Sequence, residues 1–290
     1  MPLPSTLYHY CSTSTFQAIV QSRALRLSSL SLSNDSMEGK IVARVVEKFA
    51  ERNELSLETI RNLRNLLEEF NNEVDALGFC LSEKDDLLSQ WRGYADDGNG
   101  VAIGFSSSYL NLLSKENEMP STTVKFKLEK ILYEPSEHES AIRPTYLQML
   151  QYIKDGVFNN PSKGTLLTGE NTQFKKEHIA NSKLRHELIL TLFSFLRPLY
   201  ILKSQAFREE HEWRILSNIF HGTETQCSYR TTRNGLIPYQ NLPLDKLEQI
   251  PILEIVLGPK HSTPERIIKN FMRDSGFPET KVRRSEASYR

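Results

Sequence analysis

The order of strand-type and helix-type segments is the feature that most limits the fold of this chain. Short apolar runs such as Leu7–Tyr10, Gly78–Ser82 and Val101–Phe105 predict strands. Two long stretches, at about 40–75 and 139–203, carry apolar residues at helical spacing. Strands and helices do not alternate strictly, as they do in a doubly wound parallel sheet. We therefore expect an α+β fold in one domain, residues 1–290, with those two stretches as helical insertions.

Several enzyme classes with recognisable motifs are excluded. The chain contains no GxGxxG, GxxxxGK[ST], HExxH or GxSxG pattern, which argues against Rossmann cofactor binding, P-loop chemistry, zincins and α/β-hydrolases. Its 36 basic and 36 acidic residues cancel, so the overall basic excess typical of nucleic-acid-binding proteins is missing. A local basic run at Lys281, Arg283 and Arg284 keeps a binding module open, although such a run is usually a solvated strand edge.

The cysteines and the apolar segments predict a cytoplasmic protein without a metal site or a membrane anchor. Cys11, Cys80 and Cys227 are odd in number and form no CxxC pair. The first residues lack a basic and an apolar signal region. The longest apolar stretch, Leu188–Leu202, is interrupted by an arginine and a proline and is too short for a bilayer.

The run FREEHEWRIL, Phe207–Leu216, is unusually charged for a strand. If it alternates as a strand, one face carries Arg208, Glu210, Glu212 and Arg214, and the other carries Trp213 and Ile215. The apolar pair is expected to face the core, which leaves two carboxylates between two guanidinium groups. Alternation alone favours the simpler explanation, a solvated strand whose charges pair with one another.

Other polar residues suggest that this run is the wall of a site. His9 and Tyr10 interrupt the first strand, and Trp91, Arg92 and Tyr94 form an aromatic-rich helix between two apolar strands. Asn34 and Asp35 follow the second strand, where turn formation explains them equally well. Packing is the plain alternative for Trp91, and a satisfied core or surface position is the plain alternative for His9.

The blocks LYHYCS, NDSMEG, GFCLS, WRGYADDGNGVAIGF, EEHEWRIL, ILEIVLGPK and SEASYR resemble, in this order, the bacterial domain-of-unknown-function family 2971. The resemblance covers essentially the whole chain. It departs from the family pattern at Ser36, where a proline is usual, and the long helical stretches are less characteristic.

The same arrangement looks like a divergent ADP-ribosyltransferase, which implies a split mixed β-sheet core with helical insertions. Enzymes of that superfamily place a histidine or arginine on an early strand, an aromatic residue near the nicotinamide, and a glutamate on a late strand. His9, then Tyr10 or Tyr94, and then Glu212 match these positions. The spaced tyrosine pair of the toxin-like branch is not found.

The resemblance implies that NAD is the substrate and that His9 and Glu212 line one cleft. Cleavage of the nicotinamide–ribose bond develops positive charge on the ribose, as glycoside hydrolysis does, and Glu212 would stabilise that charge. Arg214 or Glu210 would orient Glu212, or Glu210 would activate the acceptor. His9, Tyr10, Asn34, Asp35, Trp91, Tyr94 and Arg214 are the expected NAD-binding residues, with Arg92 pairing with the diphosphate.

The implied activity is transfer of ADP-ribose to a protein or nucleic acid, as in toxins and anti-phage effectors, with a partner or inhibitor protein restraining it. Two alternatives stay open. The same fold can act as an NAD glycohydrolase with water as the acceptor, or as a catalytically silent nucleotide- or nucleic-acid-binding module.

Overall fold

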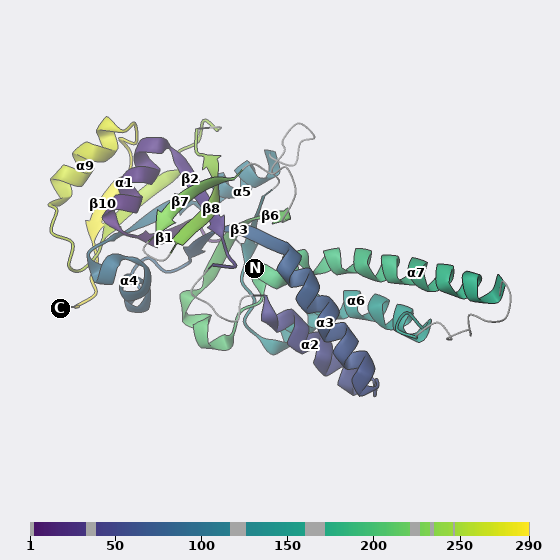
Figure 1. Ribbon diagram of the computed structural model, residues 1–290. Helices are drawn as coiled ribbons and strands as arrows, with labels where there is room; N and C mark the ends of the chain where they lie inside the picture. The colour runs from purple at the N-terminus through teal and green to yellow at the C-terminus, as the bar shows by residue number, and fades with distance from the viewer. Residues whose placement is uncertain are drawn as a thin grey trace. The chain divides into compact units, whose positions relative to one another are not determined.

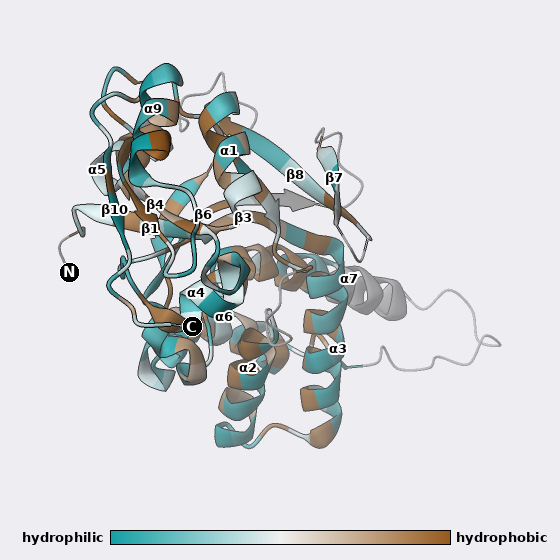
Figure 2. Cartoon of the chain, turned by 90° about the vertical axis from the view of Figure 1, so that its left-hand side faces the viewer, coloured by the Kyte–Doolittle hydropathy of each residue, from teal (hydrophilic) through white to brown (hydrophobic). Residues whose placement is uncertain are grey.

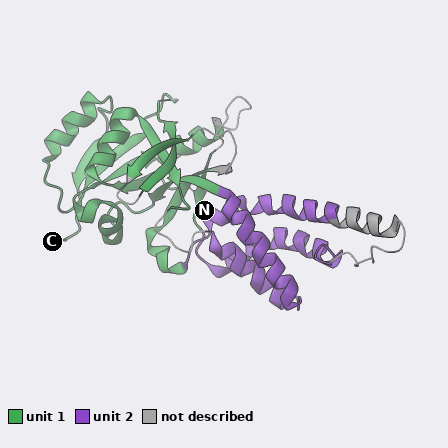
Figure 3. Cartoon of the chain, viewed as in Figure 1, with its two compact units in different colours: residues 1–34, 75–131, 205–290 green, residues 35–74, 132–204 purple. Residues whose placement is uncertain are grey.

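The chain divides into two compact units in a computed structural model that describes residues 3–32, 39–116, 126–159, 172–220, 227–232, 235–245 and 247–289. One unit comprises residues 1–34, 75–131 and 205–290, and the other comprises residues 35–74 and 132–204 (Figure 3). The first unit carries the β-sheet, and the second is helical. Both stretches expected as helical insertions contribute to the helical unit.

A mixed sheet dominates the first unit (Figure 1). Its described strands are β1 (Thr6–Cys11), β2 (Ala24–Ser29), β3 (Val74–Ser82), β4 (Val101–Ser106), β5 (Lys127–Lys130), β6 (Glu212–Phe220), β7 (Ser228–Thr232), β8 (Gly235–Pro243), β9 (Ile252–Leu257) and β10 (Lys281–Arg284). They run in the order β10-β9-β4-β1-β3-β2-β8-β7, and β6 pairs with both β3 and β5. The β9–β10 pair is parallel, whereas β1–β4 and β4–β9 are antiparallel. The expected α+β class with a mixed sheet is confirmed.

The sheet changes partners along β3. Near its start β3 pairs with β2, through Ser28–Gly78 and Ser29–Leu77. Near its end β3 pairs with β1, through Tyr8–Ser82. By contrast, β1 pairs with β4 along its whole length. The ladder between β1 and β3 therefore stops short of Phe79 and Cys80.

One side of the sheet packs on the main hydrophobic core. Helices α1 (Thr13–Ser22) and α9 (Glu265–Asp274) cover this side, and the rings of Phe16 and Phe271 meet edge to face at 5.4 Å. Ser12 begins α1 as an N-cap, its hydroxyl accepting from the Thr15 amide. Helix α5 (Ser107–Glu116) adds Tyr109, whose hydroxyl donates to the Leu244 carbonyl.

A second cluster forms on the other side, under helix α4 (Leu88–Tyr94) and the short helix η1 (Asp96–Gly98). It consists of Tyr8, Tyr10, Trp91, Ala95, Ala102 and Val256. The residues of β1 thus alternate: Leu7 and Cys11 join the main core, and Tyr8 and Tyr10 join the second cluster.

The helical unit is built mainly from α2 (Lys40–Arg52), α3 (Leu57–Glu73), α6 (Pro135–Lys154), α7 (Thr172–Leu192), η2 (Phe193–Phe195) and α8 (Leu196–Ile201). Hydrophobic and hydrophilic residues recur along α2 and α3 (Figure 2), as expected for amphipathic helices. Glu139 of α6 accepts from Lys48 and Arg52 of α2, both at 3.0 Å. None of the described helices combines the length and the apolar character that crossing a bilayer requires.

Candidate functional site

A cavity of about 610 Å³ lies in the first unit, at the place where the β1–β3 ladder stops. This volume is typical of small-molecule sites, which span about 300–1,000 Å³. The wall is built from β1, the start of α1, β2, β3, α4 and β7. The described residues that line it are His9, Tyr10, Cys11, Ser12, Ser14, Thr15, Ala18, Ile19, Ala24, Arg26, Ser28, Ser29, Leu30, Gly78, Phe79, Cys80, Tyr94 and Arg230.

His9 borders the cavity at the break in the ladder. Its Nδ1 lies 2.8 Å from the Cys80 carbonyl oxygen, and its ring stacks on Phe79 with a centroid distance of 4.0 Å. A carbonyl can only accept, so Nδ1 carries the proton and Nε2 is the nitrogen that can accept. Burial lowers the pKa of His9 to about 4, against the opposing effect of the Cys80 hydrogen bond. His9 is therefore neutral at physiological pH.

Tyr10 also lines the cavity, but its hydroxyl is committed to the backbone before α4. It donates to the Lys84 carbonyl and accepts from the Leu87 amide, both at 2.9 Å. Burial raises the pKa of Tyr10. Tyr10 meets Trp91 edge to face at 4.8 Å. These contacts fix the start of α4.

Helix α4 places its three predicted residues in different surroundings. Trp91 is fully buried and donates from Nε1 to Asp86 at 2.6 Å, so it is a core residue. Arg92 is exposed over the ring of Tyr289 and is not among the cavity-lining residues. Tyr94, in contrast, lines the cavity, and its hydroxyl lies 3.3 Å from Glu210 Oε1. Tyr94 thus joins the cavity wall to a predicted carboxylate.

The prediction that Phe207–Leu216 alternates as one strand is wrong in its first half. Residues Gln205–Glu210 form a 3₁₀ helix, His211 adopts a left-handed conformation with φ of 44°, and β6 begins at Glu212. The left-handed residue interrupts any alternation. Glu210 and Glu212 therefore do not share a strand face, although both side chains are buried.

Glu212 and Arg214 form a buried ion pair on β6. Arg214 Nε lies 2.6 Å from Glu212 Oε1, and a second guanidinium nitrogen lies 3.2 Å from Oε2. The two residues are only 5 % and 3 % exposed. The pair is not the solvated charge pattern that alternation favours, and neither residue is among those described as lining the cavity.

The cavity receives residues from both sides of the sheet, because α1 and His9 come from the core side and Arg26 comes from the other. On β6, Ile215 joins the main core, so Glu212 and Arg214 alternate to the other side. On β2, Leu25 and Leu27 join the main core, so Arg26 likewise alternates away from it. His9 leaves β1 on the core side and reaches the cavity at the break. The described residues that line the cavity include His9 but not Glu212, so the expectation that both line one cleft stays a prediction.

Two expected residues, Asn34 and Asp35, lie outside the described residues. The sequence reasoning also missed part of the wall. Arg26 and Arg230 border the cavity, together with the hydroxyls of Ser12, Ser14 and Ser28. Only Arg26 had a usable signal, because it stands between Leu25 and Leu27 and must point away from their face.

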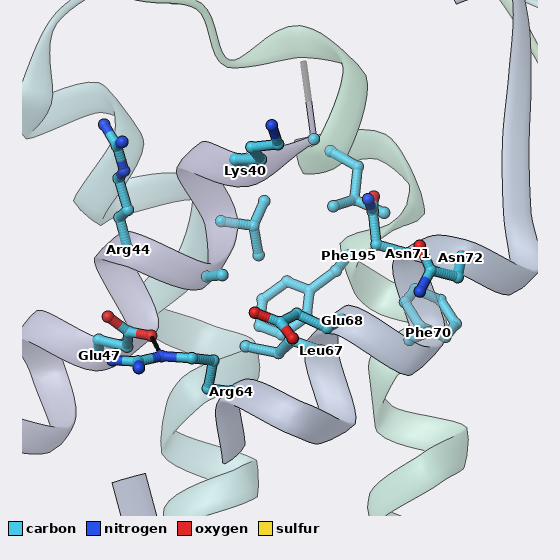
Figure 4. Close-up of a pocket in the computed structure, with 14 residues that line it drawn as sticks. Lys40, Arg44, Glu47, Arg64, Leu67, Glu68, Phe70, Asn71, Asn72 and Phe195 are labelled. Carbon is cyan, nitrogen blue, oxygen red and sulfur yellow. Dashed lines mark hydrogen bonds and ion pairs between the residues drawn. The ribbon is translucent and has the colours of Figure 1, made fainter. Parts of the chain in front are cut away.

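A second cavity, of about 460 Å³, lies in the helical unit (Figure 4). Its rim carries Lys40, Arg44 and Asn71, and Arg64 forms an ion pair with Glu47 across it. The lining carries both basic and acidic side chains, so it does not favour a ligand of one charge. None of the predicted site residues lines it.

Among the described residues, no group of three or more histidine, cysteine, aspartate or glutamate side chains is arranged to hold a metal ion. The carboxylates near the cavity are engaged with other protein groups.

A family model described as "Protein of unknown function (DUF2971)" matches residues 90–215. The match includes Trp91, Arg92, Tyr94, Glu210, Glu212 and Arg214. The resemblance of the motifs predicted a match over essentially the whole chain, whereas the family model matches only this part of it. No curated protein matches this chain. No solved structure matches it either.

Proposed function

We propose that the first unit binds NAD in the cavity beside His9 and cleaves its nicotinamide–ribose bond, transferring ADP-ribose to a macromolecular acceptor. The observation that carries the proposal is the Tyr94–Glu210 hydrogen bond. It connects the wall of a ligand-sized cavity to a buried carboxylate, and the same wall carries a neutral histidine. The interruption of the sheet at the cavity also supports the proposal, because the resemblance to ADP-ribosyltransferases implies a split sheet.

His9 is suited to hold a ribose hydroxyl. Its protonated Nδ1 is fixed by the Cys80 carbonyl, and Phe79 supports the ring from one face. A neutral imidazole offers Nε2 as an acceptor for a hydroxyl proton. Because the pKa of His9 is lowered to about 4, this acceptor is available throughout the physiological pH range.

Glu210, acting through Tyr94, is suited to stabilise the developing charge. Departure of nicotinamide leaves an oxocarbenium-like ribose, which a nearby carboxylate stabilises. Tyr94 is 44 % exposed in the cavity wall and can turn its hydroxyl between Glu210 and a ribose hydroxyl. In this assignment Glu210 is the carboxylate closest to the ligand.

Glu212 and Arg214 then support the reacting segment. Their ion pair anchors the start of β6, two residues after Glu210. The Ser82 hydroxyl donates to the Glu210 carbonyl at 2.7 Å and ties the same segment to β3. A direct catalytic role for Glu212 stays a prediction, because Arg214 holds both of its oxygens. The cytoplasmic location, expected from the cysteines and the apolar segments, and the role as a toxin or anti-phage effector, implied by the resemblance, likewise stay predictions.

The test is release of nicotinamide from NAD by the purified full chain, with and without cell lysate. Transfer requires release that depends on lysate and a labelled macromolecule when the adenine carries a label. The Glu210→Gln and Tyr94→Phe variants should lose most of that release. Release of equal rate without lysate would show a glycohydrolase instead.

Saturable NAD binding without any nicotinamide release, in either condition, would overturn the enzymatic proposal and leave a binding module. A variant control is Glu265→Gln on α9, because Glu265 contacts Lys269 of the same helix and lies outside the cavity wall. Its release rate should equal that of the unmodified chain.

A further inference from the structure

The half of the sheet formed by β2, β8 and β7 presents two arginines to the cavity. Arg26 lies opposite Asn241 on β8, and Arg230 lies opposite Ile237 on the same strand. Directly paired residues point to the same side of a sheet, and residues four apart on one strand also share a side. Arg26 and Arg230 therefore point to the same side, and both line the cavity.

The cavity wall is electrostatically one-sided. No carboxylate is among the described residues that line it, whereas two guanidinium groups are. Within the described part of the chain, neither Arg26 nor Arg230 has a carboxylate within 4.0 Å. This contrasts with Arg283 and Arg214, which are paired with carboxylates. Two cations without a carboxylate partner among the described residues, placed around a concave surface, favour an anionic ligand.

Arg26 is also held in position. Its guanidinium carbon lies 5.1 Å from the centroid of the Tyr239 ring, on the same side of β8 as Asn241. Stacking uses the face of the guanidinium and leaves its N–H edge available for a planar or tetrahedral oxyanion. The hydroxyls of Ser12, Ser14 and Ser28 add neutral donors to the same wall.

We propose that Arg26 and Arg230 form a diphosphate-binding subsite of this cavity. The fork of an arginine matches phosphate oxygens with two parallel hydrogen bonds. Two arginines on strands separated by β8 approach the ligand from positions about 10 Å apart across the sheet, so each can take one phosphate group. Diphosphate binding here rests on the proposed function, since NAD supplies the diphosphate, but it is measurable without any cleavage.

The experiment measures binding of ADP-ribose, pyrophosphate, adenosine and citrate to the full chain by calorimetry. ADP-ribose and pyrophosphate should bind, and adenosine should bind much more weakly. Arg26→Gln and Arg230→Gln should each weaken ADP-ribose binding by about tenfold or more, the cost of one charge-assisted contact. Arg26→Lys should keep part of the affinity because it keeps the charge. Arg266→Gln, an exposed arginine of α9 outside the wall, is the matched control.

Equal binding of adenosine and ADP-ribose, or ADP-ribose binding that both glutamine variants leave unchanged, would overturn the subsite. Citrate binding as tight as that of pyrophosphate would also overturn it, because a general anion site is not a diphosphate site. Failure of the proposed function looks different: ADP-ribose then binds in an arginine-dependent manner while NAD is not cleaved. Equal thermal unfolding of all variants excludes loss of the fold as the cause.

Discussion

The hydroxyl of Tyr94, in the cavity wall, lies within hydrogen-bond distance of the Glu210 carboxylate, which is buried behind it. The two residues come from separate segments, α4 and the 3₁₀ helix before β6, and neither position alone would make a site. A phenol that is both solvent-accessible and tied to a carboxylate can pass a hydrogen bond to a ligand without exposing the charge.

Replacing Tyr94 by phenylalanine should separate chemistry from stability. The variant loses the donor to Glu210, and nicotinamide release should fall about 10- to 100-fold, the effect expected for one hydrogen bond to a charged group. The free energy of unfolding should change by less than about 1 kcal/mol, because the side chain is 44 % exposed. Steady-state release assays and urea unfolding measure the two quantities.

The matched control for this substitution is Tyr152→Phe, in the helical unit and outside the cavity wall. It should leave nicotinamide release unchanged. If Tyr94→Phe released nicotinamide as fast as Tyr152→Phe, the Tyr94–Glu210 contact would have no part in the reaction.

Substituting the two glutamates should destabilise the fold to different extents. Glu212→Gln removes one charge of a buried ion pair with Arg214 and should destabilise the fold by on the order of 3 kcal/mol. In Glu210→Gln the amide oxygen can still accept from the Tyr94 hydroxyl, so the free energy of unfolding should fall by only about 1 kcal/mol. Urea unfolding of both variants gives the comparison.

A double substitution sharpens that prediction. Replacing Glu212 and Arg214 together by methionine removes both buried charges, so it should recover much of the stability lost in Glu212→Gln. A double variant as unstable as the sum of its single variants would show that the pair contributes no coupling. Activity of Glu212→Gln is informative only at a temperature where the variant is folded.

The sequence was a good guide to the elements and a poor guide to their junctions. Period-two and period-3.6 patterns correctly predicted a strand around Leu7–Tyr10, a strand around Val101–Phe105 and the two helices after Gly39. The patterns failed at Arg208–His211, where the chain forms a 3₁₀ turn followed by a left-handed residue. A run of charged residues looks the same in the sequence whether it forms such a turn or a strand. Backbone conformation at a single residue is set there by tertiary contacts such as Ser82 with the Glu210 carbonyl.

The cavity itself was beyond sequence reasoning for a similar reason. It depends on β3 leaving β2 near Gly78 and reaching β1 only at Ser82. That exchange of partners brings Arg230 of β7 to the same wall as His9. Alternation indicates which side of a strand a residue takes, but it does not indicate where a ladder stops.

His9 should make the stability of the fold depend on pH. Burial lowers the pKa of His9 to about 4, from an ordinary value near 6.5. Between these values the unfolded chain binds more protons than the folded chain, so stability is complete above about pH 6.5 and falls toward pH 4. The loss attributable to His9 should be about 3 kcal/mol. Unfolding at several pH values measures it.

The comparison variant is His9→Gln, which lacks the titrating group. Its stability should fall less steeply between pH 6.5 and 4, and the difference between the two curves isolates His9 from other groups such as His261, whose pKa burial also lowers. Parallel curves would mean that His9 is not protected from protonation in the folded chain.

Asp86 ties the last residues of the chain to α4, and its loss should loosen the helix that carries Tyr94. The carboxylate accepts from Trp91 Nε1, from the Ser285 hydroxyl and from the Glu286 amide, all at 2.6 Å. Burial acts to raise the pKa of Asp86, but these donors outweigh it and lower the pKa.

In Asp86→Asn one carboxylate oxygen is replaced by an NH₂ group, which cannot accept from these donors. At least one of the hydrogen bonds is therefore lost, and the free energy of unfolding should fall by about 1–3 kcal/mol. Amide hydrogen exchange should rise across residues 88–98, and thiol labelling of Cys80, which shares the cavity wall with Tyr94, should become faster. Asp274→Asn is the matched control, because Asp274 pairs with Arg273 at the surface, where such pairs contribute little. Exchange in 88–98 that is the same in both variants would show that the chain end does not hold α4 in place.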